Sequence, residues 1–245
     1  MTKADNRIAL VTGANKGLGF ETSRKLAQIG IFVLMGSRSI ARGKAAAKEL
    51  QQEGLPVEFI QLDVTKPEQM RRAASEITSR YGKLDILVNN AGISVGEGHG
   101  RNSTESVTPK ALRATFEVNF FGLVELTQRL MPLLRKSDAG RIVNISSILG
   151  SLAIHSREDG MSYKPFAYDA SKTAVNTFTI HLAAALADTT IKVNSAHPGW
   201  VRTDMGGPSA PLTASEGAET AVRLATLESD GPTGKFFHGE EELPW

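Results

Sequence analysis

The sequence predicts an α/β protein whose mostly parallel, doubly wound sheet has about seven strands flanked by helices. Short apolar runs alternate along the chain with segments rich in Ala, Leu, Glu, Lys and Arg. Continuous apolar runs are typical of strands buried on both faces, as in parallel sheets covered by helices. With right-handed crossovers, such a sheet binds its ligands beyond the carboxyl ends of the strands.

Seven apolar runs are the candidate strands, and the last of them is the weakest. They lie at residues 8–11, 31–35, 57–60, 84–88, 141–145, 191–195 and 235–237. The helix-forming segments between them include 41–52 and 68–81. Because no internal repeat or low-complexity linker interrupts this alternation, we predict a single domain.

Composition excludes several classes of function. Lys plus Arg number 28 and Asp plus Glu 26, so neither nucleic acid nor an anionic membrane is an expected partner. The absence of cysteine excludes disulfides, thiolate catalysis and thiolate metal ligation. None of the five histidines forms a pair with metal-ligand spacing, so no metal site is expected. The polar segment 1–7 and the lack of a long apolar stretch predict a cytoplasmic protein.

The turn between the first strand and the first helix has the composition of a phosphate-binding loop. Its glycines follow the pattern G-x-x-x-G-x-G. One glycine permits a tight turn, and the others let backbone N–H groups and the helix terminus approach a pyrophosphate. A Gly-rich turn without a ligand is the alternative. The predicted dinucleotide contacts are Gly13, Asn15, Lys16, Gly17, Leu18 and Gly19.

The end of the second strand distinguishes NADP from NAD. NAD-binding proteins usually place an acid there, which accepts hydrogen bonds from the ribose hydroxyls. This chain has Ser37 and Arg38 instead, with no acid in residues 35–39. Ser37 avoids the repulsion that a carboxylate would exert on a phosphate, and the Arg38 guanidinium suits a 2′-phosphate. Lys16 adds a second positive charge, so we predict NADP(H) as the cofactor.

Four motifs stand in order along the chain. They are T-G-x-x-x-G-x-G at 12–19, N-N-A-G at 89–92, Y-x-x-x-K at 168–172 and P-G-x-x-x-T at 198–203. In this order they resemble the motifs of the short-chain dehydrogenase/reductase family, and segments 13–19 and 197–205 are most similar to its NADPH-dependent carbonyl reductases. The resemblance implies one Rossmann-type catalytic domain over 1–245, with a cofactor half at about 1–140 and a catalytic and substrate half at about 141–245.

The resemblance also implies further cofactor contacts. Asp63 and Val64 would contact the adenine, and the alternative for Asp63 is an ordinary acid at a helix start. Segment 90–92 would pass a ribose with its backbone, and Val201 and Thr203 would meet the nicotinamide carboxamide. The contacts implied in this way are Asp63, Val64, Asn90, Ala91, Gly92, Pro198, Gly199, Val201 and Thr203, together with Tyr168 and Lys172.

Tyr168 and Lys172 have the spacing to act together in carbonyl reduction. Side chains four residues apart emerge on one face of a helix. A free tyrosine titrates near pH ~10, and a neighbouring ammonium lowers that pKa by favouring the phenolate. We therefore predict Tyr168 as the proton donor to the carbonyl oxygen. The resemblance implies that Lys172 also holds the nicotinamide ribose hydroxyls.

Two further residues complete the predicted catalytic set. Ser147 would donate a hydrogen bond to the developing oxyanion. The neighbouring Ser146 competes for this role, but on an extended segment the two point to opposite faces, and the family pattern favours Ser147. By resemblance, Asn119 completes a proton relay through water. From the residues alone, Asn119 could equally be a polar residue in a helix bend.

Two variable segments bear on the substrate and on assembly. Residues 154–165 lengthen the usual gap between the serine and the tyrosine, so a homo-oligomer and a monomer both remain open. The Gly- and Pro-rich segment 205–212 is predicted as a loop closing over the substrate. An apolar pocket wall is expected from Met161, Phe166, Trp200 and Met205, whereas Phe116, Phe120 and Phe121 are expected in the core or a subunit interface.

The leading hypothesis is an NADPH-dependent reductase of ketones or aldehydes. An uncharged carbonyl substrate is favoured because no cation is clearly placed to grip a carboxylate, although Arg202 lies nearby. A dedicated biosynthetic reductase, of the 3-oxoacyl or steroid type, is the alternative. A non-catalytic NADP(H)-binding regulator is a remote one, since such proteins typically lose the tyrosine or the lysine and this chain keeps both.

Overall fold

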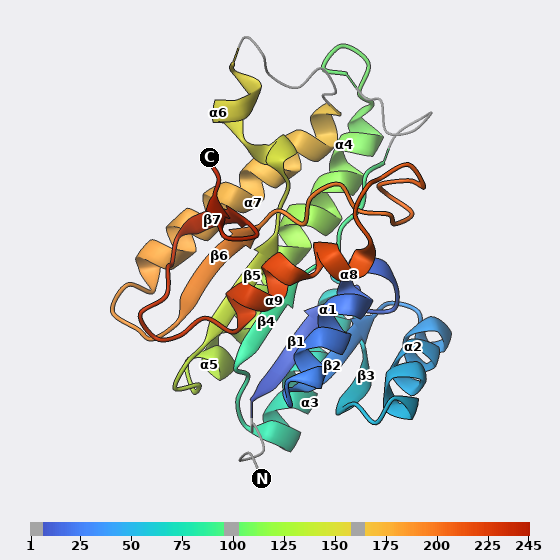
Figure 1. The fold of residues 1–245 in the computed structure, drawn as a ribbon, viewed down its shortest axis with the longest axis vertical. Coiled ribbons are helices and arrows are strands. Elements are labelled where there is room, and N and C mark those ends of the chain that lie inside the picture. Colours follow the sequence, from blue (N-terminus) through green and yellow to red (C-terminus); the bar gives the residue numbers. More distant parts are fainter. Residues whose placement is uncertain (1–6, 96–102, 158–164) are drawn as a thin grey trace.

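The computed structural model describes residues 7–95, 103–157 and 165–245. Its eight strands form one sheet in the order β3-β2-β1-β4-β5-β6-β7-β8 (Figure 1). The strands are β1 (Ile8–Thr12), β2 (Phe32–Ser37), β3 (Val57–Gln61), β4 (Ile86–Asn89), β5 (Arg141–Ile145), β6 (Lys192–Ala196), β7 (Lys235–His238) and β8 (Glu241–Glu242).

All seven predicted strands form, with ends displaced by at most two residues, and the six pairs that they form with one another are parallel. The predicted doubly wound fold is thereby confirmed. The eighth strand, β8, pairs antiparallel with β7 through Glu241 and Glu242. Two polar residues at a sheet edge carry no apolar signal, so the sequence pattern did not indicate it.

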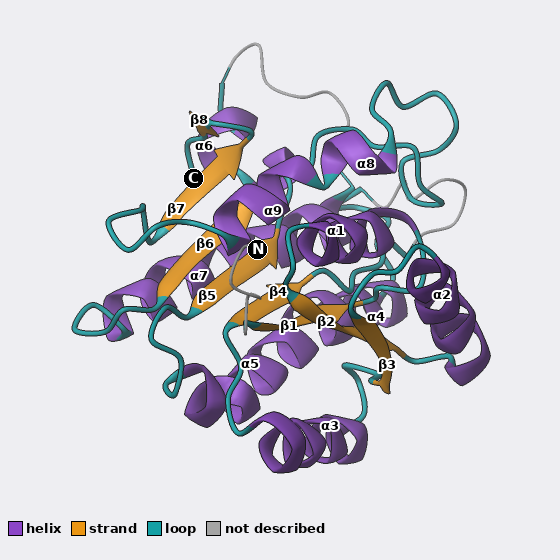
Figure 2. Ribbon diagram, turned by 60° about the horizontal axis from the view of Figure 1, so that its bottom comes forward, coloured by secondary structure: helices purple, strands orange, loops and turns teal. Residues whose placement is uncertain are grey.

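Helices connect the strands and cover both faces of the sheet (Figure 2). Their starts are set by local chemistry: the Ser39 hydroxyl caps α2, and Pro67 occupies the first turn of α3. The helices are α1 (Gly17–Gln28), α2 (Ile40–Gln52), α3 (Pro67–Tyr81), α4 (Pro109–Phe116), α5 (Gly122–Leu134), α6 (Leu152–His155), α7 (Phe166–Ala185), α8 (Ala214–Gly217) and α9 (Glu219–Ala225). A π-helical turn, η1 (Glu117–Phe121), joins α4 to α5, and a 3₁₀ turn, η2 (Ile148–Gly150), follows β5.

Alternate residues of a strand pack into two separate hydrophobic cores, one on each face of the sheet. Ala9 and Val11 of β1 pack in the core beneath α1, α2 and α9. Leu10, between them, packs on the opposite face with α3, α5 and the end of α7. This alternation follows from the period of two in a strand. The two layers hold the strands rigid, so the loops at their carboxyl ends are displayed from a fixed frame.

Close backbone approach brings the loop after β3 against the start of α5. A Cβ atom on Gly122 would overlap the carbonyl oxygen of Val64. Val64 is itself buried. Glycine at position 122 therefore lets the helix that follows η1 press against the segment carrying Asp63 and Val64.

We expect Gly122→Ala to lower the free energy of unfolding by roughly 1–3 kcal/mol, because the added methyl forces a backbone shift. The intrinsic helix preference would by itself favour alanine by about 1 kcal/mol. Urea unfolding measures the difference. The control Gln128→Ala, on the exposed side of the same helix, should change stability by less than about 0.5 kcal/mol. A stabilised Gly122→Ala protein would contradict the packing described.

Candidate active site

The Gly-rich turn after β1 is locked to the segment that follows β4. The Thr12 hydroxyl accepts hydrogen bonds from the backbone N–H groups of Asn90 and Ala91, each at 2.9 Å. The Asn90 amide donates back to the Thr12 carbonyl oxygen at 2.8 Å. A Cβ on Gly19 would overlap this amide. The T-G-x-x-x-G-x-G and N-N-A-G motifs thus form one structure at the carboxyl edge of the sheet.

The turn itself has the backbone that its glycines permit. Gly13 has φ +66° and Gly17 has φ +56°, both in the left-handed region that favours glycine. Leu18 is one of the predicted dinucleotide contacts. Its half-buried side chain packs against the core below α1 and therefore stabilises the fold. The backbone N–H groups that open α1 are then directed at the space beyond the strand ends.

The residues at the end of β2 fit a 2′-phosphate. The Ser37 hydroxyl is buried and donates to Asn15 Oδ1 at 3.2 Å. Arg38 is exposed next to it. Arg42, in the first turn of α2, lines a cavity of about 360 Å³ with Asn15 and Lys16, and Glu49 lies on its wall. In the part of the chain that the structure describes, no salt bridge ties either arginine to a carboxylate.

Sequence reasoning missed Arg42. The sequence feature that could have indicated Arg42 is its spacing: it lies four residues after Arg38, at the start of a helix. Such an arginine cannot be told apart from an ordinary solvated one without the fold. Lys16, the other predicted cation, forms an ion pair with Asp204 from the loop after β6.

Asp63 and Val64 lie in the turn between β3 and α3. Asp63 Oδ1 accepts hydrogen bonds from the Thr65 backbone N–H at 3.0 Å and from the Thr65 hydroxyl at 2.8 Å. The Asp63 N–H donates to Gln69 Oε1 at 2.9 Å. These bonds shape the turn, as expected for an acid near a helix start. The predicted adenine contact remains a prediction.

Helix α7 places Tyr168 and Lys172 on one face, as their spacing predicted. The Lys172 ammonium lies 5.5 Å from the centroid of the Tyr168 ring. It donates a hydrogen bond of 2.7 Å to the carbonyl oxygen of Ile145, the last residue of β5. Lys172 is 3% exposed, and burial lowers its pKa to about 8. The amine is therefore held directly under the tyrosine ring, at the carboxyl edge of β5.

The two adjacent serines after β5 have different surroundings. The Ser146 hydroxyl is buried and donates to the Lys172 carbonyl oxygen at 3.4 Å. The Ser147 hydroxyl caps η2 and accepts from the Leu149 N–H at 3.2 Å. The Ser146 hydroxyl is thus turned towards the backbone of α7. This geometry is compatible with Ser147 as the oxyanion donor, which remains a prediction.

Asn119 lies in the π-helical turn η1, buried beside the lysine. Its Oδ1 accepts from the Ile93 N–H at 2.8 Å, and its Nδ2 donates to the Ile93 carbonyl oxygen at 2.9 Å and to the Ser171 hydroxyl at 3.0 Å. A Cβ on Gly92 would lie 3.5 Å from Asn119 Oδ1 and 3.7 Å from Lys172 Nζ. The side chain of Asn119 therefore fixes the segment after Gly92 to α7. Its part in a proton relay remains a prediction.

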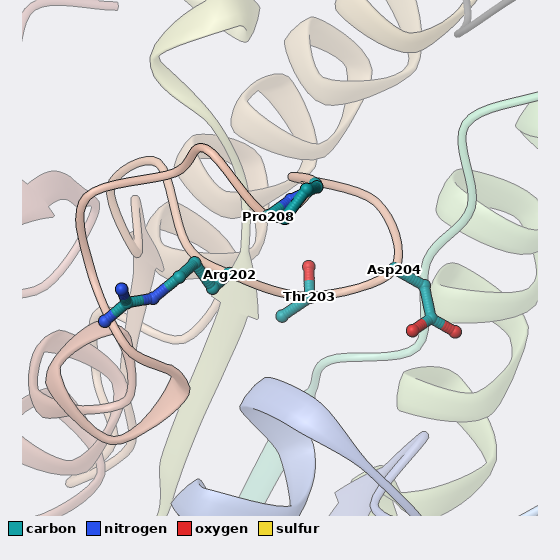
Figure 3. Close-up of a pocket in the computed structure, with 5 residues that line it drawn as sticks. Arg202, Thr203, Asp204 and Pro208 are labelled. Carbon is teal, nitrogen blue, oxygen red and sulfur yellow. The ribbon is translucent and has the colours of Figure 1, made fainter.

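The loop after β6 approaches the Gly-rich turn. Gly199 turns the chain with φ +81°, next to Pro198, and Val201 forms an isolated bridge with Leu212. Figure 3 shows the Thr203 methyl carbon pointing down towards the helix below the loop, with the hydroxyl oxygen pointing up, and a Cβ on Gly17 would lie 3.3 Å from Thr203 Cγ2. A cavity of about 440 Å³ is lined by Arg202, Thr203, Asp204, Gly207 and Pro208 (Figure 3).

Three of the four residues expected to form an apolar pocket wall expose their side chains, and their place in a pocket remains a prediction. Trp200 is 56% exposed and Met205 is 48% exposed, both on this loop, and Phe166 is exposed at the start of α7. Met161 lies outside the described residues, as does segment 158–164 of the insertion. The insertion begins within the short helix α6, whose Ala153 N–H donates to the Trp245 carbonyl oxygen at 2.8 Å.

Other candidates do not belong to the site chemistry. Burial lowers the pKa of His197 to about 3, helped by His238, whose ring centroid lies 5.0 Å away. It is therefore a neutral structural residue near pH 7. Phe121 is 54% exposed, so it does not lie in the core, and the alternative expectation, a subunit interface, remains a prediction. Across residues 7–95, 103–157 and 165–245, no group of three metal-ligating side chains and no membrane-spanning helix is found.

We expect the buried amine of Lys172 to make stability depend on pH between about 8 and 10.5. The folded pKa lies below the unfolded one, so the cost of burying the ammonium is full below pH 8 and vanishes above 10.5. As the pH rises through this interval, the free energy of unfolding of the wild type should increase by about 3 kcal/mol relative to that of Lys172→Met. Urea unfolding measures the difference. The exposed variant Lys110→Met should parallel the wild type. A constant difference between wild type and Lys172→Met would contradict the assignment.

Known proteins resemble the chain over almost its whole length. Residues 7–212 match the family described as short chain dehydrogenase. Carbonyl reductase (NADPH) 1 of Bos taurus is 37% identical, covering 99% of each chain. Salutaridine reductase of Papaver bracteatum is 36% identical, covering 96% of this chain and 95% of its own.

Solved structures also resemble the chain over almost its whole length. NADPH-bound carbonyl reductase from chicken fatty liver has a TM-score of 0.84 at 26% identity, covering 98% of this chain and 99% of its own. Salutaridine reductase from Papaver somniferum has a TM-score of 0.83 at 32% identity, covering 94% and 99%. Together with the four motifs at one edge of the sheet, these matches lead to one conclusion. The chain belongs to the short-chain dehydrogenase/reductase family.

Proposed function

We propose that this protein is an NADPH-dependent carbonyl reductase that reduces uncharged ketones or aldehydes. The observation that carries the proposal is the pairing of Tyr168 with a buried Lys172 beside Gly92. An aromatic hydroxyl can donate its proton more readily when a cation lies beneath the ring, because the cation stabilises the phenolate that forms. Relatives named as NADPH carbonyl reductases support it across the full chain.

NADP(H) is the cofactor. Ser37 stands where an acid would exclude a phosphate, and Arg38 and Arg42 supply positive charge there. Gly13 and Gly17 leave the turn open for a pyrophosphate. The preference for NADPH agrees with the names of the relatives and with solved structures holding NADP or NADPH. When bound, the cofactor supplies the hydride that reaches the carbonyl carbon.

The positions of the side chains are compatible with the following proposed roles. The Tyr168 hydroxyl donates its proton to the carbonyl oxygen, and the Lys172 ammonium stabilises the resulting phenolate. Ser147 donates a hydrogen bond to the same oxygen as negative charge develops on it. Lys172 also holds the ribose hydroxyls next to the nicotinamide. Asn119 keeps η1 and the segment after Gly92 fixed against α7.

The chemistry of the loop supports an apolar substrate. Trp200 and Met205 expose large hydrophobic surfaces, and Trp200 Nε1 is already bonded to the Gly206 carbonyl oxygen at 2.8 Å. A hydrophobic ketone would cover these surfaces. A panel of carbonyl compounds should therefore include quinones, bicyclic and steroid ketones and 3-oxoacyl thioesters. Exclusive turnover of the last two would favour a dedicated biosynthetic reductase.

Tyr168→Phe should lower kcat for carbonyl reduction by about 10²–10⁴-fold, because the proton donor to the carbonyl oxygen is lost. Loss of NADPH absorbance on addition of the carbonyl panel measures this. NADPH binding, measured by fluorescence, should remain. Tyr81→Phe, which removes a hydroxyl on α3, is the matched control and should keep full activity. A Tyr168→Phe enzyme with unchanged kcat would refute the mechanism.

Arg38→Ala should weaken NADPH binding by about 10- to 150-fold and leave NADH binding within about twofold. A charge-assisted hydrogen bond to phosphate is worth about 1.5–3 kcal/mol, and NADH has no phosphate at this position. Calorimetric titration with both dinucleotides is the measurement. Arg72→Ala, an exposed arginine on α3, should bind both as the wild type does. Equal losses for NADPH and NADH would show that Arg38 does not contact the 2′-phosphate.

A further inference from the structure

Asp204 joins the substrate-side loop to the Gly-rich turn. Its carboxylate forms an ion pair with the Lys16 ammonium, across 188 positions of sequence. Both side chains are largely exposed, at 79% for Asp204 and 57% for Lys16. Lys16 immediately precedes α1 and lines the same cavity as Arg42. The pair therefore bridges the two halves of the domain at the mouth of the cofactor site.

The backbone around Asp204 directs its side chain towards Lys16. The Gly206 N–H donates to the Thr203 hydroxyl at 3.2 Å, and the Gly207 N–H donates to the Thr203 carbonyl oxygen at 2.9 Å. These bonds close a tight turn over residues 203–207. Figure 3 shows Asp204 on the side of this turn opposite to Arg202. Thr203, between them, rests on Gly17.

The carboxylate stands in a positive field. Lys16 lowers the pKa of Asp204 through its hydrogen bond and charge, and Arg42 adds to the effect. Lys16 and Arg42 also line the cavity next to Ser37, where a 2′-phosphate fits. Asp204 is thus an anion held by cations that the phosphate also requires. Two like charges sharing one ammonium repel each other.

We propose that Asp204 determines cofactor specificity by competing with the 2′-phosphate of NADP(H) for Lys16, so that phosphate binding releases the 202–212 loop from the Gly-rich turn. The inference rests on the proposed function, which assigns NADP(H) to this site. A ligand without the 2′-phosphate leaves the ion pair in place. Asp204 then weakens the binding of phosphate-bearing ligands alone, and links occupation of the 2′-phosphate position to the loop that carries Trp200 and Met205.

Binding of 2′,5′-ADP and of 5′-ADP tests the competition without catalysis. Asp204→Asn should bind 2′,5′-ADP about two- to fivefold more tightly than the wild type, as expected for removing one exposed ion pair. Its affinity for 5′-ADP should be unchanged within about 1.5-fold. Calorimetric titration at one fixed salt concentration is the measurement. Asp188→Asn, which removes an equal charge from an exposed site beyond α7, should behave as the wild type.

A double-mutant cycle with Lys16→Met separates competition for the ammonium from repulsion at a distance. In the Lys16→Met background, Asp204→Asn should give no further gain in 2′,5′-ADP affinity. A gain of the same size in both backgrounds would overturn the partner exchange. So would weaker binding of 2′,5′-ADP by Asp204→Asn, which would mean that the acid supports Lys16 in the complex.

Hydrogen exchange of the Gly206 and Gly207 amides tests release of the loop. We expect faster exchange with 2′,5′-ADP bound than with 5′-ADP bound, and identical rates would overturn the coupling. The two proposals fail in distinguishable ways. If the wild type binds 2′,5′-ADP no better than 5′-ADP, the assignment of NADP(H) fails. If the wild type prefers 2′,5′-ADP but Asp204→Asn equals Asp188→Asn, only the role of Asp204 fails.

Discussion

Burial of the Lys172 amine is the constraint around which the candidate site is built. An ammonium out of water is costly unless it is hydrogen-bonded, and the Ile145 carbonyl oxygen at the end of β5 supplies one bond. That oxygen is available because β5 ends there and the chain turns away through the two serines. The helix that carries Lys172 must therefore lie against this strand end, which places Tyr168 over the carboxyl edge.

The rest of the edge is arranged by close approach of backbone to backbone. The Thr12 hydroxyl accepts hydrogen bonds from two N–H groups of the segment after β4, and Gly19 leaves room for the Asn90 amide. Asn119 fastens the continuation of that segment to α7. One chain of contacts thus connects the Gly-rich turn to the helix of the tyrosine. The expected cofactor positions and the expected proton donor share a single rigid frame.

The sequence predicted the fold because strands buried on both faces are continuously apolar, and all seven such runs became strands. It missed β8, since Glu241 and Glu242 pair only through their backbone at an edge. The motifs located the site because glycine conformations and an i, i+4 pair are local properties. Arg42 was not predicted, because its sequence context does not distinguish it from an ordinary solvated arginine. The ion pair between Lys16 and Asp204 was not predicted either, because only the tertiary structure brings the two residues together. The exposure of Phe121 likewise depends on how η1 turns the helix.

The proposed reaction transfers hydride directly from the nicotinamide to a carbonyl carbon. Its sharpest test uses NADPH deuterated at the transferable position of the nicotinamide, with a ketone that the enzyme turns over. Mass spectrometry and NMR of the alcohol locate the label. We predict one deuterium on the carbinol carbon, an unlabelled hydroxyl proton exchanged with water, and a slower reaction than with unlabelled NADPH. An alcohol without deuterium on that carbon would contradict it.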